Sequence, residues 1–172
     1  MSSSLVLISE ATASSSGNIT LTGMSSTYDV YQLVIADATP DTDAAYLRMK
    51  YTESGTKNDT SNYDGAEIIL FAASSNYSSG VANSAGYNIT NHTNGTSAGE
   101  STSANLYIFN SQDSGEYTMA TIESVSRDHG DESYGTFGGM VFTVASTVDG
   151  VYLYYTSGNI ASGEFKLYGL KK

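Results

Sequence analysis

The C-terminal stretch of the chain reads Gly158-Asn159-Ile160-Ala161-Ser162-Gly163-Glu164-Phe165-Lys166-Leu167-Tyr168-Gly169-Leu170. Apolar and polar residues alternate in its second half, which is the period of a β-strand that buries one face. Near the other end, the same alternation occurs in Ile19-Thr20-Leu21-Thr22-Gly23 and in Tyr28-Asp29-Val30-Tyr31-Gln32-Leu33-Val34-Ile35. A turn sequence, Ser16-Gly17-Asn18, precedes the stretch at 19–23, and a similar one, Ser157-Gly158-Asn159, precedes Ile160. We therefore expect the first and last strands to lie side by side in one closed β-sandwich.

Further strands are predicted along the rest of the chain. Leu47, Met49 and Tyr51 alternate with more polar neighbours, which indicates a half-buried strand. The dipeptide Asp149-Gly150 stands between two alternating segments and is the strongest hairpin signal in the sequence. No long segment has the i, i+3, i+4 apolar spacing of a helix. The predicted fold class is all-β, an antiparallel β-sandwich of about eight to ten strands with adjacent N- and C-terminal strands.

The 172 residues predict a single domain, 1–172, because they are too few for two comfortable domains. One segment, at about 73–103, interrupts the strand pattern and is rich in Ser, Asn, Gly and Thr. We expect a long polar loop there, with one short strand at 86–90. Loops of this length in a compact domain are usually functional or mobile. We therefore place Tyr77, Tyr87 and Asn91 on an outward-facing variable surface.

Charge excludes some classes of partner. The chain has 7 Lys and Arg against 18 Asp and Glu, a formal net charge of −11 at pH 7. Such a surface repels phosphate backbones, so we expect no nucleic-acid partner. No apolar stretch approaches the roughly 18 residues of a membrane-spanning helix, and residues 1–8 lack the regions of a signal peptide. We therefore expect that the protein does not insert into a membrane. We also expect that it is assembled in a host cytoplasm.

Few residues suggest catalytic or metal chemistry. There is no cysteine, which excludes disulfides and thiolate ligands, and no serine lies in a Gly-x-Ser-x-Gly elbow. Asp128, Asp131 and Glu132 share one predicted loop and are weak candidates for a structural Ca²⁺, but their spacing matches no calcium-loop motif. His92 and His129 lie in different predicted loops, which argues against zinc. We predict no enzyme, no catalytic residue, no metal and no cofactor.

Tyrosine is abundant, with 14 in the chain. Tyr152 and Tyr154 stand in one predicted strand, and Tyr168 stands in the last. Tyrosine gives a large contact area at low entropy cost and is enriched at interfaces. We therefore expect Tyr152, Tyr154 and Tyr168 at a subunit contact. Burial in an ordinary core and stacking on a ligand are the alternatives.

Five segments carry a resemblance to a known family: 19–23, 28–31, 37–43 around Pro40, 47–49 and 158–170. Together they resemble a structural module of tailed bacteriophage virions, especially those of marine phages. The final block, which ends in Phe-x-Leu-Tyr-Gly-Leu, is the most diagnostic part. The resemblance implies a jelly-roll sandwich, usually a homotrimer, and no catalytic residues. Residues 53–103 depart from the pattern, so the resemblance leaves ligand specificity open.

Three roles are compatible with these expectations. The first, which we favour, is a homotrimeric capsid decoration or cement protein that binds the major capsid protein and stabilises the head of the virion. The second is a small tail or fibre-tip protein that binds a host surface glycan through the long polar loop. The third is a secreted carbohydrate-binding protein. The six Asn-x-Ser/Thr sequons suit the third role, but without a predicted signal peptide we take them to arise by chance.

Overall fold

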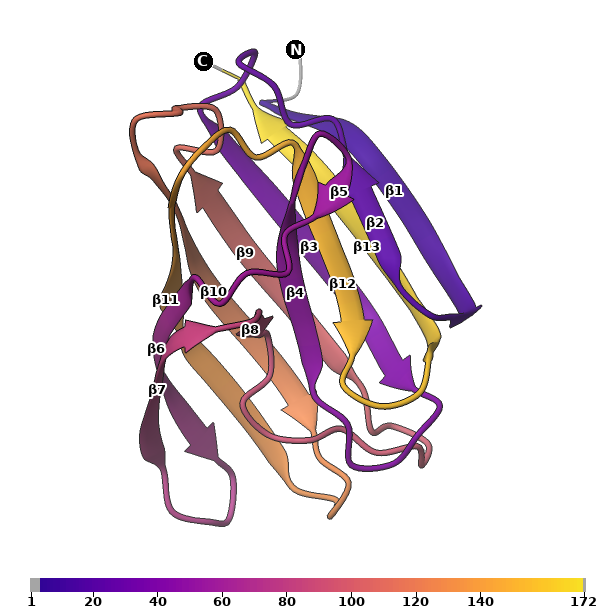
Figure 1. The fold of residues 1–172 in the computed structure, drawn as a ribbon. Helices are drawn as coiled ribbons and strands as arrows, with labels where there is room; N and C mark the ends of the chain where they lie inside the picture. The colour runs from indigo at the N-terminus through magenta and orange to yellow at the C-terminus, as the bar shows by residue number, and fades with distance from the viewer. Residues whose placement is uncertain (1–3, 172) are drawn as a thin grey trace.

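The computed structural model describes residues 4–171, which form two stacked antiparallel sheets (Figure 1). Residues 1–3 and 172 lie outside the described part, and with them the start of the segment from which we predict no signal peptide. The strands are, in chain order, β1 (Leu5–Ser16), β2 (Ile19–Thr22), β3 (Val30–Pro40), β4 (Leu47–Glu53), β5 (Thr56–Lys57), β6 (Tyr63–Phe71), β7 (Tyr77–Ser84), β8 (Tyr87–Asn88), β9 (Thr102–Phe109), β10 (Tyr117–Arg127), β11 (Ser133–Ala145), β12 (Gly150–Tyr155) and β13 (Ile160–Leu170). Within residues 4–171 no helix is long and apolar enough to cross a membrane.

The strand order confirms the predicted antiparallel sandwich, although residues 4–171 form thirteen strands rather than about eight to ten. The hairpin predicted at Asp149-Gly150 does not form, because β11 and β12 lie in different sheets. The larger sheet has eight strands in the order β1-β13-β3-β9-β10-β11-β6-β7, and the smaller has the order β2-β12-β4-β5 with β8 beside β4. Four strands of each sheet, β1-β13-β3-β9 and β2-β12-β4-β8, follow the jelly-roll order. The other four strands of the larger sheet, β10, β11, β6 and β7, extend it beyond β9 (Figure 1). The N- and C-terminal strands pair as predicted, β1 with β13, with Leu5 opposite Leu170. Of the two stretches from which this pairing is predicted, 28–35 leads into β3 and also pairs with β13, whereas 19–23 contains β2, which pairs with β12 in the smaller sheet.

Alternation along the strands places one apolar set between the two sheets. In β4, Leu47, Met49 and Tyr51 are fully buried, as the sequence pattern predicts. Phe142 of β11 joins this core, with its ring centroid 4.9 Å from that of Tyr63 and 5.7 Å from that of Tyr51. Burial raises the pKa of both tyrosines, so their phenols stay neutral. Aromatic pairs of this kind contribute about 0.5–1.5 kcal/mol beyond area burial. They fasten the smaller sheet to the added strands of the larger one.

Segment 73–103 differs from the single long loop that the sequence predicts. Residues Tyr77–Ser84 form β7, which pairs with β6 at the edge of the larger sheet. Residues Tyr87–Asn88 form β8, inside the strand predicted at 86–90. No alternation marks β7 in the sequence because most of its side chains are exposed, and backbone hydrogen bonds to β6 hold it instead. Tyr87 is only 1% exposed and packs in the core, which corrects the expectation that it lies on an outward surface.

A buried asparagine fixes part of this segment against the larger sheet. Asn94 exchanges two backbone hydrogen bonds with Ala45, at 2.8 and 3.1 Å. The side-chain Nδ2 of Asn94 donates to the carbonyl oxygen of Arg127 at 3.2 Å. A Cβ on the next residue, Gly95, would stand 2.8 Å from the Cα of His129, so this close approach requires glycine. The chain around Asn94 is therefore held against the turn between β10 and β11.

Candidate functional site on the outer face of the larger sheet

The side of the larger sheet that points away from the smaller sheet carries exposed apolar side chains. Paired residues on adjacent strands point to the same face of a sheet. Phe137 of β11 lies opposite Ile68 of β6 on one side and Glu123 of β10 on the other, so three strands contribute to one row. We define the apolar outer face by six exposed large side chains on this side of the sheet, which are Ile68, Leu70, Tyr107, Met119, Val125 and Phe137.

Strand β10 shows how the sequence builds this face. Its residues alternate regularly between buried and exposed positions. Thr118 and Ser124 are among the buried residues, whereas Met119 and Val125 are exposed, Val125 by 62%. Large apolar side chains therefore point outward here, which is the reverse of a strand with a solvated outer face. Contiguous apolar surface of this kind marks interaction sites.

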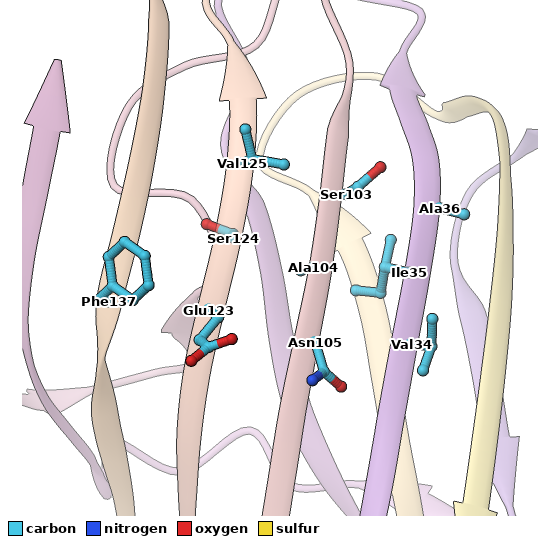
Figure 2. A pocket seen from close by; sticks show the side chains of 10 residues that line it. All are labelled: Val34, Ile35, Ala36, Ser103, Ala104, Asn105, Glu123, Ser124, Val125 and Phe137. Carbon is cyan, nitrogen blue, oxygen red and sulfur yellow. The ribbon is translucent and has the colours of Figure 1, made fainter. Parts of the chain in front are cut away.

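A shallow hollow of about 520 Å³ lies in the apolar outer face (Figure 2). Phe137 and Val125 line one side of the hollow, and Val34 of β3 lines the other. The short side chains of β9, Ser103 and Asn105, lie between them. A carboxylate, that of Glu123, also lines the hollow. A volume of this size accepts a large apolar side chain or a sugar ring.

The structure does not bring the three predicted interface tyrosines together. Tyr152 and Tyr154 lie on β12 of the smaller sheet, where Tyr152 is opposite Lys50 of β4. Their ring centroids are 5.6 Å apart, and both side chains are half-buried. Tyr168 lies on β13 of the larger sheet, opposite Gln32 of β3. One flat contact therefore cannot contain all three, and Tyr168 is the one that lies in the larger sheet.

Two of the residues predicted for a variable surface do come together. Tyr77 is exposed on β7, and its Oη donates to the carbonyl oxygen of Asn91 at 3.2 Å. The ring of Tyr77 stacks on Phe71 with 5.8 Å between centroids. Tyr87 instead donates its hydroxyl to Glu67 Oε2 at 2.6 Å inside the sandwich. Burial raises the pKa of Glu67, and the hydrogen bond from Tyr87 acts in the opposite direction.

The three weak metal candidates do not converge on one point. Asp128 Oδ1 accepts hydrogen bonds from two backbone N–H groups of its own turn, both at 2.8 Å. Asp131 pairs with Arg127 at 3.2 Å. Glu132 accepts a hydrogen bond from the hydroxyl of Ser74 at 2.6 Å, and this bond is the main reason that the pKa of Glu132 is lowered. Each carboxylate therefore has its own partner, and the second oxygen of Asp128 faces a histidine instead.

None of the six side chains that define the apolar outer face is among the site residues predicted from the sequence. A signal was present in β10, where large apolar residues occur in both alternating sets: Met119 and Val125 in one, Ile122 in the other. Strands of this composition are covered on both faces. Comparison of the chain with protein-family models, with curated proteins and with solved structures finds no match.

Proposed function

We propose that the chain is a non-enzymatic structural protein of a phage virion, a homotrimer that decorates the capsid and stabilises the head. The observation that carries this proposal is the apolar outer face, which needs a partner to cover it. The trimeric state and the location on a virion are inferred from the resemblance of the terminal segments to virion modules.

The partner that best fits the apolar outer face is a second copy of the chain. Two molecules that each carry a net charge of −11 repel one another through most of their surfaces. The six side chains that define the apolar outer face are uncharged. Two carboxylates lie beside them: Glu123 in the hollow, and Asp64 at the margin in the row of Met119, where it accepts a hydrogen bond from the backbone N–H of Asn83. Copies therefore approach one another with least repulsion through this face.

The size of the face favours a ring over a simple pair. It covers four neighbouring strands, β9, β10, β11 and β6, which is about 19 Å at the usual strand spacing of about 4.8 Å. From Met119 to Val125 it extends roughly 20 Å, so its flat area is about 380 Å². A stable interface buries about 800 Å² per partner. A subunit in a ring buries two surfaces, and the second is available at the edge strand β7.

Strand β7 is one of the two edge strands of the larger sheet, and its Tyr77 and Val81 are exposed. Such an edge presents unpaired backbone groups that proteins usually cover. Packing the β7 edge of one copy against the apolar outer face of the next is a head-to-tail contact, which forms a ring when the rotation between copies closes and an open filament when it does not. We propose three copies in that ring. A trimer of this kind stabilises a capsid by mass action, because it binds the assembled shell and not the separate shell subunits.

The first test is the mass of the assembly in solution. Val125→Asp places a charge in the apolar outer face, and Thr20→Asp places the same charge on the exposed outer side of the smaller sheet. We expect native mass spectrometry to give a trimer for the wild type and for Thr20→Asp, and a folded monomer for Val125→Asp. A monomeric wild type, or a trimeric Val125→Asp variant, would contradict the proposal.

The second test locates the protein on particles. An antibody against the chain is applied to purified virions and followed by immunogold electron microscopy. Label spread over the heads supports decoration, and heads that lack the protein should then burst at lower osmotic stress. Label confined to the tail replaces decoration by a tail role, and no label on any particle removes the virion proposal.

A glycan-binding role is the second candidate, and the hollow in Figure 2 favours it. Phe137 offers an exposed ring for stacking on a sugar, while Asn105 and Glu123 offer polar groups beside it. A glycan array separates the two roles. Binding that is lost in Phe137→Ala while the wild-type protein is monomeric supports the glycan role over self-assembly.

A further inference from the structure

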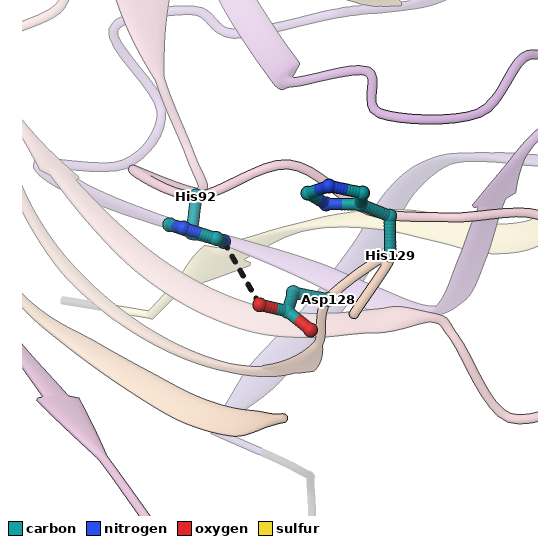
Figure 3. A group of neighbouring side chains, drawn as sticks. All are labelled: His92, Asp128 and His129. Atoms are coloured by element: carbon teal, nitrogen blue, oxygen red, sulfur yellow. Dashed lines mark ion pairs between the residues drawn. The ribbon is translucent and has the colours of Figure 1, made fainter. Parts of the chain in front are cut away.

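We propose that His92, Asp128 and His129 form a binding site for a divalent transition metal of the zinc class. Figure 3 shows the three side chains gathered at one place. His92 comes from the segment between β8 and β9, and the other two come from the turn between β10 and β11. One ligand atom from each residue lies within 4.8 Å of the other two. This proposal is independent of the proposed trimer.

Asp128 is already placed as a metal-binding carboxylate. It is 5% exposed, and its Oδ1 accepts the backbone N–H groups of Gly130 and Glu132, both at 2.8 Å. These two bonds fix the carboxylate plane and leave Oδ2 directed at His92, 3.2 Å from its Nδ1. Hydrogen bonds from outside the ligand set that orient a ligand in this way are a regular property of metal sites.

His92 provides an observation that points to a ligand. Its ring packs edge-on against Phe71 at 5.3 Å and Tyr134 at 5.7 Å, and Tyr134 Oη donates to the His92 carbonyl at 2.9 Å. The Nδ1 atom of His92 is buried and makes no hydrogen bond, although Asp128 Oδ2 is near, because the two groups are not aligned for one. Buried polar atoms are nearly always satisfied. A metal ion between Nδ1 and Oδ2 would satisfy both atoms.

His129 completes the group from the solvent side. Its ring lies nearly parallel to that of His92, with 6.2 Å between centroids and 21° between planes. Its Nδ1 is 2.8 Å from Thr93 Oγ1. When Nδ1–H donates to this hydroxyl, Nε2 keeps a lone pair for a metal, which is the usual arrangement of a ligating histidine. The buried Asn94 holds Thr93 and His92 in place, as described above.

The ligand types and spacings select the metal. Two imidazoles and one carboxylate suit Zn²⁺ and its neighbours, whereas Ca²⁺ and Mg²⁺ prefer oxygen ligands alone. Two ligands of a tetrahedral zinc are about 3.3 Å apart when each bond is about 2.05 Å. The His92 and Asp128 atoms are 3.2 Å apart and already meet this distance. His129 is exposed, so it can turn inward to close the remaining gap, and water takes the fourth position.

The experiment is a titration of the chelator-treated, full-length protein with Zn²⁺ by calorimetry, together with Co²⁺ as a spectroscopic probe. We expect one ion per chain, visible Co²⁺ absorption of a tetrahedral site, and a rise in melting temperature with Zn²⁺ but not with Ca²⁺. His129→Gln should weaken Zn²⁺ binding at least tenfold without loss of the fold, because His129 is exposed. Asp131→Asn is the matched control in the same turn, and it should bind like the wild type because Asp131 is paired with Arg127 instead.

Two outcomes would overturn the metal site. One is no saturable binding in the wild type, which leaves His92 and Asp128 as an ordinary, partly buried ion pair. The other is equal weakening in His129→Gln and Asp131→Asn, which assigns the binding to the acidic surface as a whole.

Discussion

The outer faces of the two sheets differ in what covers their aromatic side chains. On the smaller sheet, Lys57 Nζ lies 5.3 Å from the ring centroid of Tyr152, and Lys50 Nζ lies 5.5 Å from that of Tyr154. On the larger sheet, Phe137 is 45% exposed, and within residues 4–171 no such cation lies over its ring. Cations of the same chain thus cover the aromatic rings of the smaller sheet, whereas the ring of Phe137 on the larger sheet is left exposed. An interface is indicated by missing neighbours rather than by aromatic content.

The largest expected effect comes from breaking the core that lies beneath both faces. Phe142→Ala removes a ring that contacts Tyr51 of the smaller sheet and Tyr63 of the larger. We expect the free energy of unfolding to fall by about 3–5 kcal/mol, because a large buried side chain is replaced by a cavity. Chemical denaturation measures this loss. A loss under about 1 kcal/mol would mean that the two sheets do not share this core.

Phe137→Ala, five residues earlier on the same strand, separates folding from assembly. The side chain is exposed, so we expect the unfolding free energy of the monomer to change by no more than about 0.5 kcal/mol. Aromatic residues near the centre of an interface contribute about 2 kcal/mol or more to binding. We therefore expect sedimentation analysis to show association weakened by roughly thirtyfold. Unchanged association would assign the contact to another surface.

Glu67→Gln tests the polar interior beneath the apolar outer face. Burial raises the pKa of Glu67 above its usual 4.5. Between pH 4.5 and the raised pKa, the folded protein therefore keeps a proton on Glu67 that the unfolded chain releases. Stability therefore falls as the pH rises from 4.5 through the raised pKa, and the loss is complete above it. We expect Glu67→Gln to flatten this slope and to change the unfolding free energy near pH 7 by about 1 kcal/mol or less. Denaturation at several pH values measures it, and a slope identical to that of the wild type contradicts the interpretation.

The smallest expected effect is at the covered face. Tyr152→Ala removes a ring that lies under Lys57 and beside Tyr154. A surface cation–π contact contributes about 0.5–1 kcal/mol, so we expect a loss of stability of that size and an unchanged oligomer. Thermal melting and native mass spectrometry check the two parts. Dissociation of the oligomer would place the subunit contact on the smaller sheet, as the sequence-based hypothesis for Tyr152 and Tyr154 predicts.

Much of the fold follows from the sequence because alternation reports burial directly. Leu47, Met49 and Tyr51 point inward as their spacing predicts, and the end strands pair as predicted. Strand β7 could not be found in this way, because it is an edge strand with most side chains in solvent. Its position depends on backbone hydrogen bonds to β6, which leave no trace in residue type.

The candidate sites were harder to predict for a related reason. Alternation says which residues face away from the core, but not whether another side chain covers them, so it cannot separate Tyr152 from Phe137. The histidines lie far apart in sequence, and the argument against zinc rests on that separation. Their proximity depends on Asn94, whose amide fastens one segment to the carbonyl oxygen of Arg127 in the other. Such a long-range polar contact has no local sequence signal.

The central claim, that a partner copy covers the apolar outer face, is tested most directly by thiol labelling. The chain has no cysteine, so Val125→Cys and Thr20→Cys each provide one defined probe, and both positions are exposed in the single chain. The rate of maleimide labelling is measured for each variant at high protein concentration and after dilution. We expect the thiol at position 125 to be protected at high concentration and to become reactive on dilution, while the thiol at position 20 reacts equally under both conditions. Equal and rapid labelling of both thiols at every concentration would contradict the claim.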